Sequence, residues 1–369
     1  MALLLVTGAA CDGKQSTGGT GGDDAAADAA AGGDGGAADA SSLPGRVILN
    51  RVRINSHSKQ ENFQRARAPF DLGAGPFAKV TLTVELATTC FPFALWKDDM
   101  PPSGQNWPPK CDAFDRLFEV ILDGPTAEGQ KPGIELVRAI TPFGGPLRFE
   151  ADITDVINGL PGAHTLEAYI DTWSDGAGKV TGSDAGWTVS ASITATKGPA
   201  PREVLGVVPL FHGSQRQAKV EPIGFAAPAG TGKIRVEYRA TGHTLEAGPR
   251  DAACLGPAEE FCRRKHVIEL DGAAVDEFDA WKTDCATLCT PLRLPGPNGQ
   301  DINICTENPC GAMASVRAPR ANWCPGSVSP PRVIEQALAP GEHKLGWGVD
   351  VLQMGGSWRI SAAAIFYRN

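Results

Sequence analysis

The sequence predicts an all-β protein made of two tandem antiparallel jelly-roll β-sandwich domains, packed side by side and preceded by a disordered tether. Three observations predict this fold. Short apolar or alternating runs rich in β-branched residues recur between Gly, Pro, Asn and Asp. No long amphipathic helix is apparent, the nearest being the short segment 153–160. Two stretches also occur twice in the same order, which indicates an internal repeat.

The predicted strands follow one another along both halves of the chain. Those of the first half are 46–54, 79–86, 116–124, 134–140, 165–173 and 187–196. Those of the second half are 204–211, 219–227, 233–240, 266–272, 332–338, 343–351 and 358–367. A Gly- and Pro-containing linker, 196–203, separates the two sets.

The repeat is carried by two markers. The sequence EVILDG, 119–124, corresponds to VIELDG, 267–272, and Pro161–Asp171 lines up with Pro340–Asp350. The markers lie further apart in the second half, where the stretch Cys285–Cys324 supplies the extra length. We therefore expect a signal-like segment and tether over 1–43, a jelly roll over 44–198, and a jelly roll with a cysteine-rich insertion over 199–369. A groove between such domains is a natural ligand site.

The first residues resemble an export signal. A short apolar run, Ala2–Val6, is followed by small residues and then by Cys11, the order of a bacterial lipoprotein signal with lipidation at the cysteine. Residues 12–42 are almost wholly Gly, Ala, Asp, Ser and Thr, which cannot bury enough surface to fold. We expect a flexible tether and an exported protein, either a cell-envelope lipoprotein or secreted, whose only membrane contact is the lipid anchor.

The charge of the chain excludes one class of partner. The formal net charge is -8 and no run of more than three Lys or Arg residues occurs, so nucleic acid is not an expected ligand. The chain is expected to be a monomer.

Cysteine usage indicates an oxidising compartment, because nine of the ten cysteines lie beyond the tether in short-range groups. The nearest pairs are Cys90 with Cys111 and Cys254 with Cys262. The remaining five are Cys285, Cys289, Cys305, Cys310 and Cys324. Five is odd, so disulfides leave one thiol over. A zinc site made of the first four of these five is the alternative, although its spacings are looser than those of structural zinc knuckles.

Charged residues lie where a strand begins in each half. Asp115 and Arg116 precede the first Asp-Gly strand, and Glu260, Arg263, Arg264 and His266 surround the start of the second. Asp171 and Trp173 end another strand. Carboxylates, arginines and indoles together suit a hydroxyl-rich substrate such as a sugar. Each feature alone also has a structural explanation: Asp-Arg pairs are commonly structural, Asp123 and Asp271 precede glycine in turns, and His164 and His343 occupy matching strand starts.

Several motifs taken together resemble the bacterial peptide:N-glycosidase F family. They are CDAFDRLFEVILDG, RAITPF, ADITDVINGLPG, YIDTW, AEEFCRRKHVIELDG and RAPRANWCPG, in this order on both halves. The resemblance runs from about Arg46 to the C-terminus. It implies two eight-stranded jelly rolls with the site between them, and hydrolysis of the amide that joins asparagine to the first GlcNAc of an N-glycan, with N-glycoprotein or glycopeptide as substrate and no metal or cofactor.

The resemblance also implies roles for individual residues. Asp115 corresponds to the principal catalytic acid/base and Glu260 to a catalytic glutamate. Asp171 is the third expected catalytic acid; it takes the place of a family glutamate and is one methylene shorter. The resemblance assigns Arg116, Arg320, Trp173, Trp323 and His243 to substrate binding. Arg264, one of the charged residues at the start of the second Asp-Gly strand, is also expected to hold sugar oxygens or the developing oxyanion. His243 lies near a family loop whose tryptophan is absent here.

Two other functions remain open at this point. A non-catalytic exported lectin or adhesin could use the same paired sandwiches and the same arginines. A copper monooxygenase of similar shape would need clustered histidines, whereas the six histidines stand singly with no His-x-His pair.

Overall fold

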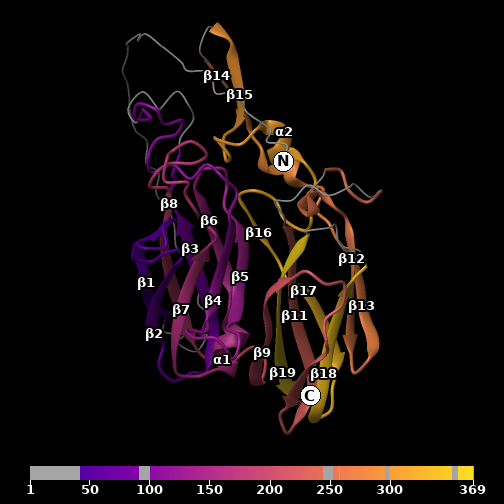
Figure 1. The fold of residues 1–369 in the computed structure, drawn as a ribbon. Helices are drawn as coiled ribbons and strands as arrows, with labels where there is room; N and C mark the ends of the chain where they lie inside the picture. The colour runs from indigo at the N-terminus through magenta and orange to yellow at the C-terminus, as the bar shows by residue number, and fades with distance from the viewer. Residues whose placement is uncertain are drawn as a thin grey trace, which may run out of the picture.

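The computed structural model describes residues 42–90, 100–243, 252–256, 258–295, 299–350 and 356–368 (Figure 1). The lipidation candidate Cys11 and the predicted tether up to residue 41 lie outside the described residues. No helix in the described part of the chain is long and apolar enough to cross a membrane.

The first half forms two antiparallel sheets around one core. One sheet has the order β1-β8-β3-β6, with strands Ser42–Asn55, Gly186–Lys197, Phe77–Leu86 and Leu147–Asp152. The other contains β5-β4-β7-β2, with strands Ile134–Ile140, Leu117–Leu122, Ala163–Ile170 and Arg65–Asp71. The helix α1, Thr154–Gly159, follows β6. Apolar side chains from both sheets meet in a shared core.

The second half repeats this arrangement. One sheet has the order β17-β11-β19-β9, with strands Arg332–Ala337, Thr231–His243, Ser357–Arg368 and Val204–Gln215. The other has the order β10-β18-β12-β13, with strands Ile223–Ala227, Gly341–Val349, Arg264–Leu270 and Ala273–Ala280. Replacing β1–β5 by β9–β13 and β6–β8 by β17–β19 converts one set of sheet orders into the other, which is the jelly-roll order in both halves. The all-β fold predicted from the sequence is confirmed.

The extra length of the second half is an insertion between β13 and β17. It consists of η3, β14, β15, α2 and β16, with bounds Cys285–Leu288, Pro291–Pro295, Asp301–Cys305, Met313–Arg317 and Ser327–Ser329. Figure 1 shows the β14-β15 ribbon and α2 at one end of the paired sandwiches. The 3-10 turn η2, Glu259–Phe261, precedes β12.

The repeat extends to single side chains. Asp123 and Asp271 both have a φ of 52°, at the turn after β4 and β12. The carboxylate of each lies 2.7 Å from the Nδ1 of the matching histidine, His164 or His343, and accepts a backbone N–H at 2.8 Å. These four residues fix the same turn in both halves, as their positions in the sequence indicate.

The two halves pack through buried charges and shared strands. Glu119 on β4 is fully buried and accepts two hydrogen bonds of 2.7 Å from Arg359 on β19. Arg138 on β5 pairs with Glu135 and donates to the Arg359 carbonyl. His212 on β9 lies 3.1 Å from Glu119. Because the partners of Glu119 come from the other half, these ion pairs fix the halves relative to each other.

β16 also crosses between the halves. It pairs with β5 through Ser327↔Ile140, Val328↔Ala139 and Ser329↔Arg138, which makes a five-stranded sheet in the order β16-β5-β4-β7-β2. Every residue of β5 is buried. The domain boundary between residues 198 and 199 lies in the connection from β8 to β9, and it stays a prediction.

Candidate active site

The loop that leads into β4 is built on a buried carboxylate. Asp112 is fully buried and accepts hydrogen bonds from Thr172 Oγ1 at 2.6 Å, from the indole of Trp187 at 3.1 Å, and from Arg116 Nε at 3.0 Å. The Cys90–Cys111 disulfide holds the residue before it. Three hydrogen bonds from different parts of the chain leave Asp112 no freedom to act on a substrate, so its role is to position the loop.

The second half builds the same support from other residue types. Glu259 in η2 is fully buried and accepts hydrogen bonds from Arg264 Nε at 2.8 Å and from the indole of Trp358 at 3.0 Å. The Cys254–Cys262 disulfide closes the loop. In each half, therefore, a buried acid binds the arginine that begins the Asp-Gly strand or directly precedes it, together with the indole of the last strand.

The next acid along the chain after Asp112 is Asp115, and the next after Glu259 is Glu260. Both lie close to one arginine. Arg320 Nη1 lies 3.1 Å from Glu260 Oε1, and Arg320 Nη2 lies 3.6 Å from Asp115 Oδ2. The carboxyl side chains are 17% and 25% exposed for Asp115 and Glu260, whereas Arg320 is 1% exposed. The structure thus brings together three of the residues predicted for the site, one from the first half and two from the second.

Arg320 is held in place from several sides. Its guanidinium carbon lies 4.7 Å from the ring centroid of Phe261 and 4.4 Å from that of Trp323, and its Nη2 donates to Ser315 Oγ at 2.9 Å. The backbone N–H of Ala321 donates to the Glu260 carbonyl at 2.8 Å. A cation between two rings keeps its charge close to the two carboxyls without moving.

The two carboxyls have raised pKa values. Burial raises the pKa of Asp115 to about 6, against the opposing effect of Arg320. Burial also raises the pKa of Glu260 to about 7; Arg320 opposes this and the nearby charge of Asp115 adds to it. Two neighbouring acids whose pKa values are both raised can hold one proton between them.

The third predicted acid lies at the exposed end of β7. Asp171 is exposed, and Gln64 Nε2 donates to its Oδ1 at 3.1 Å. Trp173 is 39% exposed, and the Arg116 guanidinium lies 5.5 Å from its ring centroid. An indole with one face available beside a fixed cation can pack on the apolar face of a sugar.

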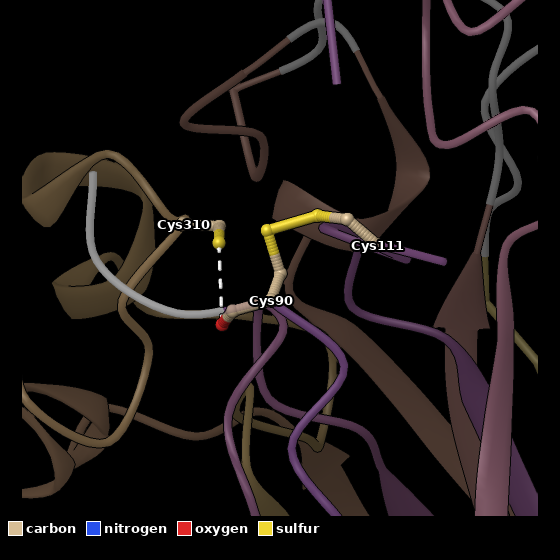
Figure 2. A group of neighbouring side chains, drawn as sticks. All are labelled: Cys90, Cys111 and Cys310. Carbon is tan, nitrogen blue, oxygen red and sulfur yellow. Dashed lines mark hydrogen bonds between the residues drawn. A yellow bond between two sulfur atoms is a disulfide. The ribbon is translucent and has the colours of Figure 1, made fainter. Parts of the chain in front are cut away.

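The remaining cysteines form two further disulfides. Cys285 pairs with Cys324 and Cys289 with Cys305. These bonds use three of the four thiols of the alternative zinc site, so that site is not formed. Cys310 is outside the four disulfides, and Figure 2 shows its thiol directed at the Cys90 carbonyl oxygen, 3.6 Å away. Burial raises the pKa of the Cys310 thiol well above its ordinary value.

Three groups of potential metal ligands occur in the described residues, each with its atoms within 4.8 Å of one another. Two of the groups contain disulfide sulfurs, which offer no thiolate. The third is Glu119, Glu135 and His212, whose carboxylates already bind Arg359 and Arg138. None of the three includes Asp115 or Glu260.

Comparison with known proteins supports the resemblance to one family. A search of curated protein sequences found no match. The family model described as "Peptide-N-glycosidase F, C terminal" matches residues 212–363. The resemblance to the peptide-N-glycosidase F family is confirmed.

Solved structures show the peptide-N-glycosidase F fold over most of the chain. PNGase F, a glycosylasparaginase from Flavobacterium meningosepticum, is 19% identical with a TM-score of 0.64, over 89% of this chain and 96% of that one. A peptide-N(4)-(N-acetyl-beta-D-glucosaminyl)asparagine amidase is 18% identical with a TM-score of 0.63, over 89% and 97%. PNGF-II is 16% identical with a TM-score of 0.63; the match covers 88% of this chain but only 65% of PNGF-II, under two thirds of its length.

Three residues predicted to bind substrate have contacts that support the surrounding loops in this peptide-N-glycosidase F fold. Arg264 is 1% exposed and binds Glu259. Trp323 is 1% exposed; it donates to the Gly242 carbonyl at 2.9 Å and lies beneath Arg320. His243 stacks on Trp323 at 5.6 Å, and burial, with Arg138 nearby, lowers the pKa of its imidazole to about 3. Their predicted contacts with substrate stay predictions; what the structure shows is the contacts that position these three side chains.

Sequence reasoning missed the two buried acids, Asp112 and Glu259. Both stand near a loop cysteine, and each accepts an indole hydrogen bond, from Trp187 in β8 and from Trp358 in β19. The equivalence of β8 and β19 in the repeat is the signal that could have found them. In both halves an acid precedes the Asp-Gly strand and a tryptophan lies at the start of the last strand. The repeat therefore predicts a hydrogen bond between that acid and that indole in each half.

Proposed function

We propose that this protein is a peptide-N4-(N-acetyl-beta-glucosaminyl)asparagine amidase, which hydrolyses the Asn–GlcNAc amide of N-glycoproteins or glycopeptides to give aspartate and a glycosylamine. The observation that carries the proposal is the contact of Asp115 and Glu260 with one buried cation, Arg320, from opposite halves of the molecule. The names of the similar solved proteins, a glycosylasparaginase and an asparagine amidase, agree with this chemistry.

The two carboxyls supply the proton transfers that amide hydrolysis needs. Asp115, with the lower pKa of about 6, is ionised near neutral pH and accepts a proton from the attacking water. The water oxygen bonds to the amide carbon. Glu260, with a pKa of about 7, donates its proton to the departing nitrogen as the C–N bond breaks. The proton taken by one acid and the proton given by the other balance the step.

Fixed positive charge accounts for the other requirement of the reaction. An amide carbonyl gains negative charge as water attacks, and a cation that is already in place stabilises this charge without reorganising. Arg320 has this property because two rings and Ser315 hold it. Trp173 packs on a sugar face in this proposal, and Asp171 accepts hydrogen bonds from sugar hydroxyls at the exposed end of β7.

We also propose that the protein is exported and that its two domains meet between residues 198 and 199. Four disulfides are typical of proteins outside the reducing cytosol. The protein is in this proposal a monomer with two jelly-roll domains, 44–198 and 199–369, and it carries a lipid at Cys11.

The test is incubation of residues 43–369 with a defined N-glycopeptide, followed by mass spectrometry, beside the Asp115→Asn variant. We expect loss of the glycan with conversion of Asn to Asp, and a decrease of at least a hundredfold in the variant, because general acid-base groups contribute roughly 10²–10⁴-fold. Asp123→Asn is the matched control, since Asp123 lies in the turn after β4 and outside the site. The control should keep full activity.

A glycopeptide that survives intact across pH 5–9 and across glycan types would refute the amidase. If the protein then retains the glycopeptide on a column, and Asp115→Asn retains it equally well, the lectin alternative replaces the proposal.

A further inference from the structure

The residues that follow β7 are bound to the loop that leads into β4. Thr172 Oγ1 donates to Asp112 at 2.6 Å, and the backbone N–H of Asp171 donates to the Leu117 carbonyl at 3.0 Å. Asp112 and Leu117 lie on either side of the proposed base, Asp115, in the sequence. The backbone therefore holds Asp171 beside the strand start that follows Asp115, and its carboxyl group is exposed there.

A glutamine from a neighbouring strand holds this carboxyl group. Gln64 directly precedes β2, and its amide nitrogen donates to Asp171 Oδ1 at 3.1 Å and to the Thr172 carbonyl at 2.9 Å. The Gln64 carbonyl accepts the backbone N–H of Ile170 at 2.9 Å. Gln64 thus binds both the backbone and the acidic side chain at the end of β7, and it is half-buried.

The turn between β1 and β2 fixes the direction of the Gln64 side chain. Gln64 has a φ of 58°, in the left-handed region that glutamine seldom adopts. Its N–H donates to the Asn55 carbonyl at 2.9 Å, and the Asn55 N–H donates to the Asn62 carbonyl at 3.0 Å. Residues other than glycine keep such a conformation where the surrounding structure enforces it, and they are frequent at ligand sites.

Tyr169 is a second polar group beside the Asp171 carboxyl. Burial raises the pKa of the Tyr169 hydroxyl, and the charge of Asp171 adds to this effect, so the hydroxyl stays a neutral donor. Tyr169 belongs to β7, the strand after which Asp171 comes. Gln64 adds a donor from a different strand, and donors from two strands restrict rotation of a carboxyl group more than one donor does.

We infer that Gln64 is a positioning residue, which fixes the direction of the Asp171 carboxylate so that it accepts hydrogen bonds from the sugar of the substrate. This inference rests on the proposed amidase function. An acceptor that is already in place when the sugar arrives loses little side-chain freedom on binding, so the affinity for substrate depends on the donor that holds it.

The experiment measures kcat and KM for the glycopeptide in residues 43–369 with and without Gln64→Asn. Asparagine adopts the left-handed region readily, so the turn is kept, but its amide is one methylene shorter and ends away from Asp171. We expect KM to rise about 2–10-fold, the contribution of one hydrogen bond, with less than about a twofold change in kcat. Damage to the loop that carries Asp115 would lower kcat instead.

Gln60→Asn is the matched control. Gln60 is in the same turn, and its Nε2 also donates to an aspartate, Asp184 Oδ1, at 3.1 Å. Because Asp184 is not among the residues of the proposed site, both kinetic constants should stay unchanged. Gln64→Gly keeps the experiment decisive if the shorter amide still reaches Asp171, since glycine adopts a positive φ without steric cost and has no side chain.

A double-mutant comparison tests whether Gln64 acts through Asp171. It is made by calorimetric titration of the glycopeptide into the Asp115→Asn variant, where the proposed base is absent. Gln64→Asn should weaken binding about 2–10-fold in this background and have no further effect once Asp171→Ala is also present. A general weakening of the fold would add to the effect of Asp171→Ala.

The outcomes separate this inference from the proposed function. An unchanged KM in both Gln64 variants, an equal rise of KM in Gln60→Asn, a lower kcat without a higher KM, or an additive effect with Asp171→Ala would each overturn the inference and leave the amidase in place. An original protein that leaves the glycopeptide intact would refute the proposed function, and the inference with it.

Discussion

Replacing Asp115 by Asn should stabilise the protein at alkaline pH, although it removes the proposed base. Burial raises the pKa of Asp115 from its ordinary value of 3.8 to about 6, so the folded protein holds a proton that the unfolded chain has released. Between these pH values the folded state binds more protons, and the free energy of unfolding decreases as the pH rises. The decrease is complete above pH 6 and persists at pH 8.

The size of this effect follows from the difference between the two pKa values. A difference of about 2 corresponds to roughly 3 kcal/mol at about 1.4 kcal/mol per pH unit. Asn resembles the protonated acid in shape and is not ionised, so Asp115→Asn escapes this cost. Relief of the like-charge contact with Glu260, which helps to raise the pKa of that acid, acts in the same direction.

Urea denaturation at pH 4 and pH 8 measures the prediction. The variant should gain about 2–3 kcal/mol relative to the original protein on going from pH 4 to pH 8. Asp171→Asn is the control, because this exposed acid should give nearly the same difference at both pH values. An Asp115→Asn variant that gains nothing, or loses stability, between pH 4 and pH 8 would refute the assignment of Asp115 as a destabilised buried acid.

Three other predictions concern the site and the packing of the halves. Arg320→Met should move the acidic limb of the kcat/KM–pH profile up by at least about 1 pH unit. The reason is that a cation 3.1–3.6 Å from two carboxylates favours their ionised forms by up to about 4 kcal/mol each. Exposed Arg317→Met is the control and should leave the profile unchanged. Trp173→Ala should raise KM for a glycopeptide about tenfold with little change in kcat, and an unchanged KM would remove the indole from the binding surface. Glu119→Gln should lower the free energy of unfolding by about 3–5 kcal/mol in urea titrations because it leaves the partly buried Arg359 without its charged partner, whereas exposed Glu85→Gln should have little effect.

Much of the fold could be predicted from the sequence because the inner strands have strong patterns. The alternating burial of β3 and β8 reproduces the alternation of their residue types. The strands β6 and β13 are among those that were missed, and their sequences, LRFEAD and AAVDEFDA, show why. Both strands lie at the edge of a sheet, with a neighbouring strand on one side only, and carry several charged residues on the exposed face. The alternation of apolar and polar residues is therefore weak in both.

The candidate site could be predicted only in part, because adjacent residues have opposite surroundings. Glu259 and Glu260 are neighbours in η2, where successive side chains point about a third of a turn apart, so one enters the core and the other faces Arg320. Sequence alone does not distinguish the two. The same limit applies to Arg264, whose position near the site was predicted but whose direction, toward Glu259, was not.

The strand β16 has a consequence for any attempt to divide this protein. It is contributed by the second half yet covers the outer edge of β5, a strand in which all seven residues are buried. A fragment that ends at residue 198 would expose both the unpaired backbone of β5 and its apolar side chains, which is the combination that promotes edge-to-edge aggregation. The first sandwich therefore depends on the second for its solubility, and a gene cut at the linker should yield an insoluble N-terminal product.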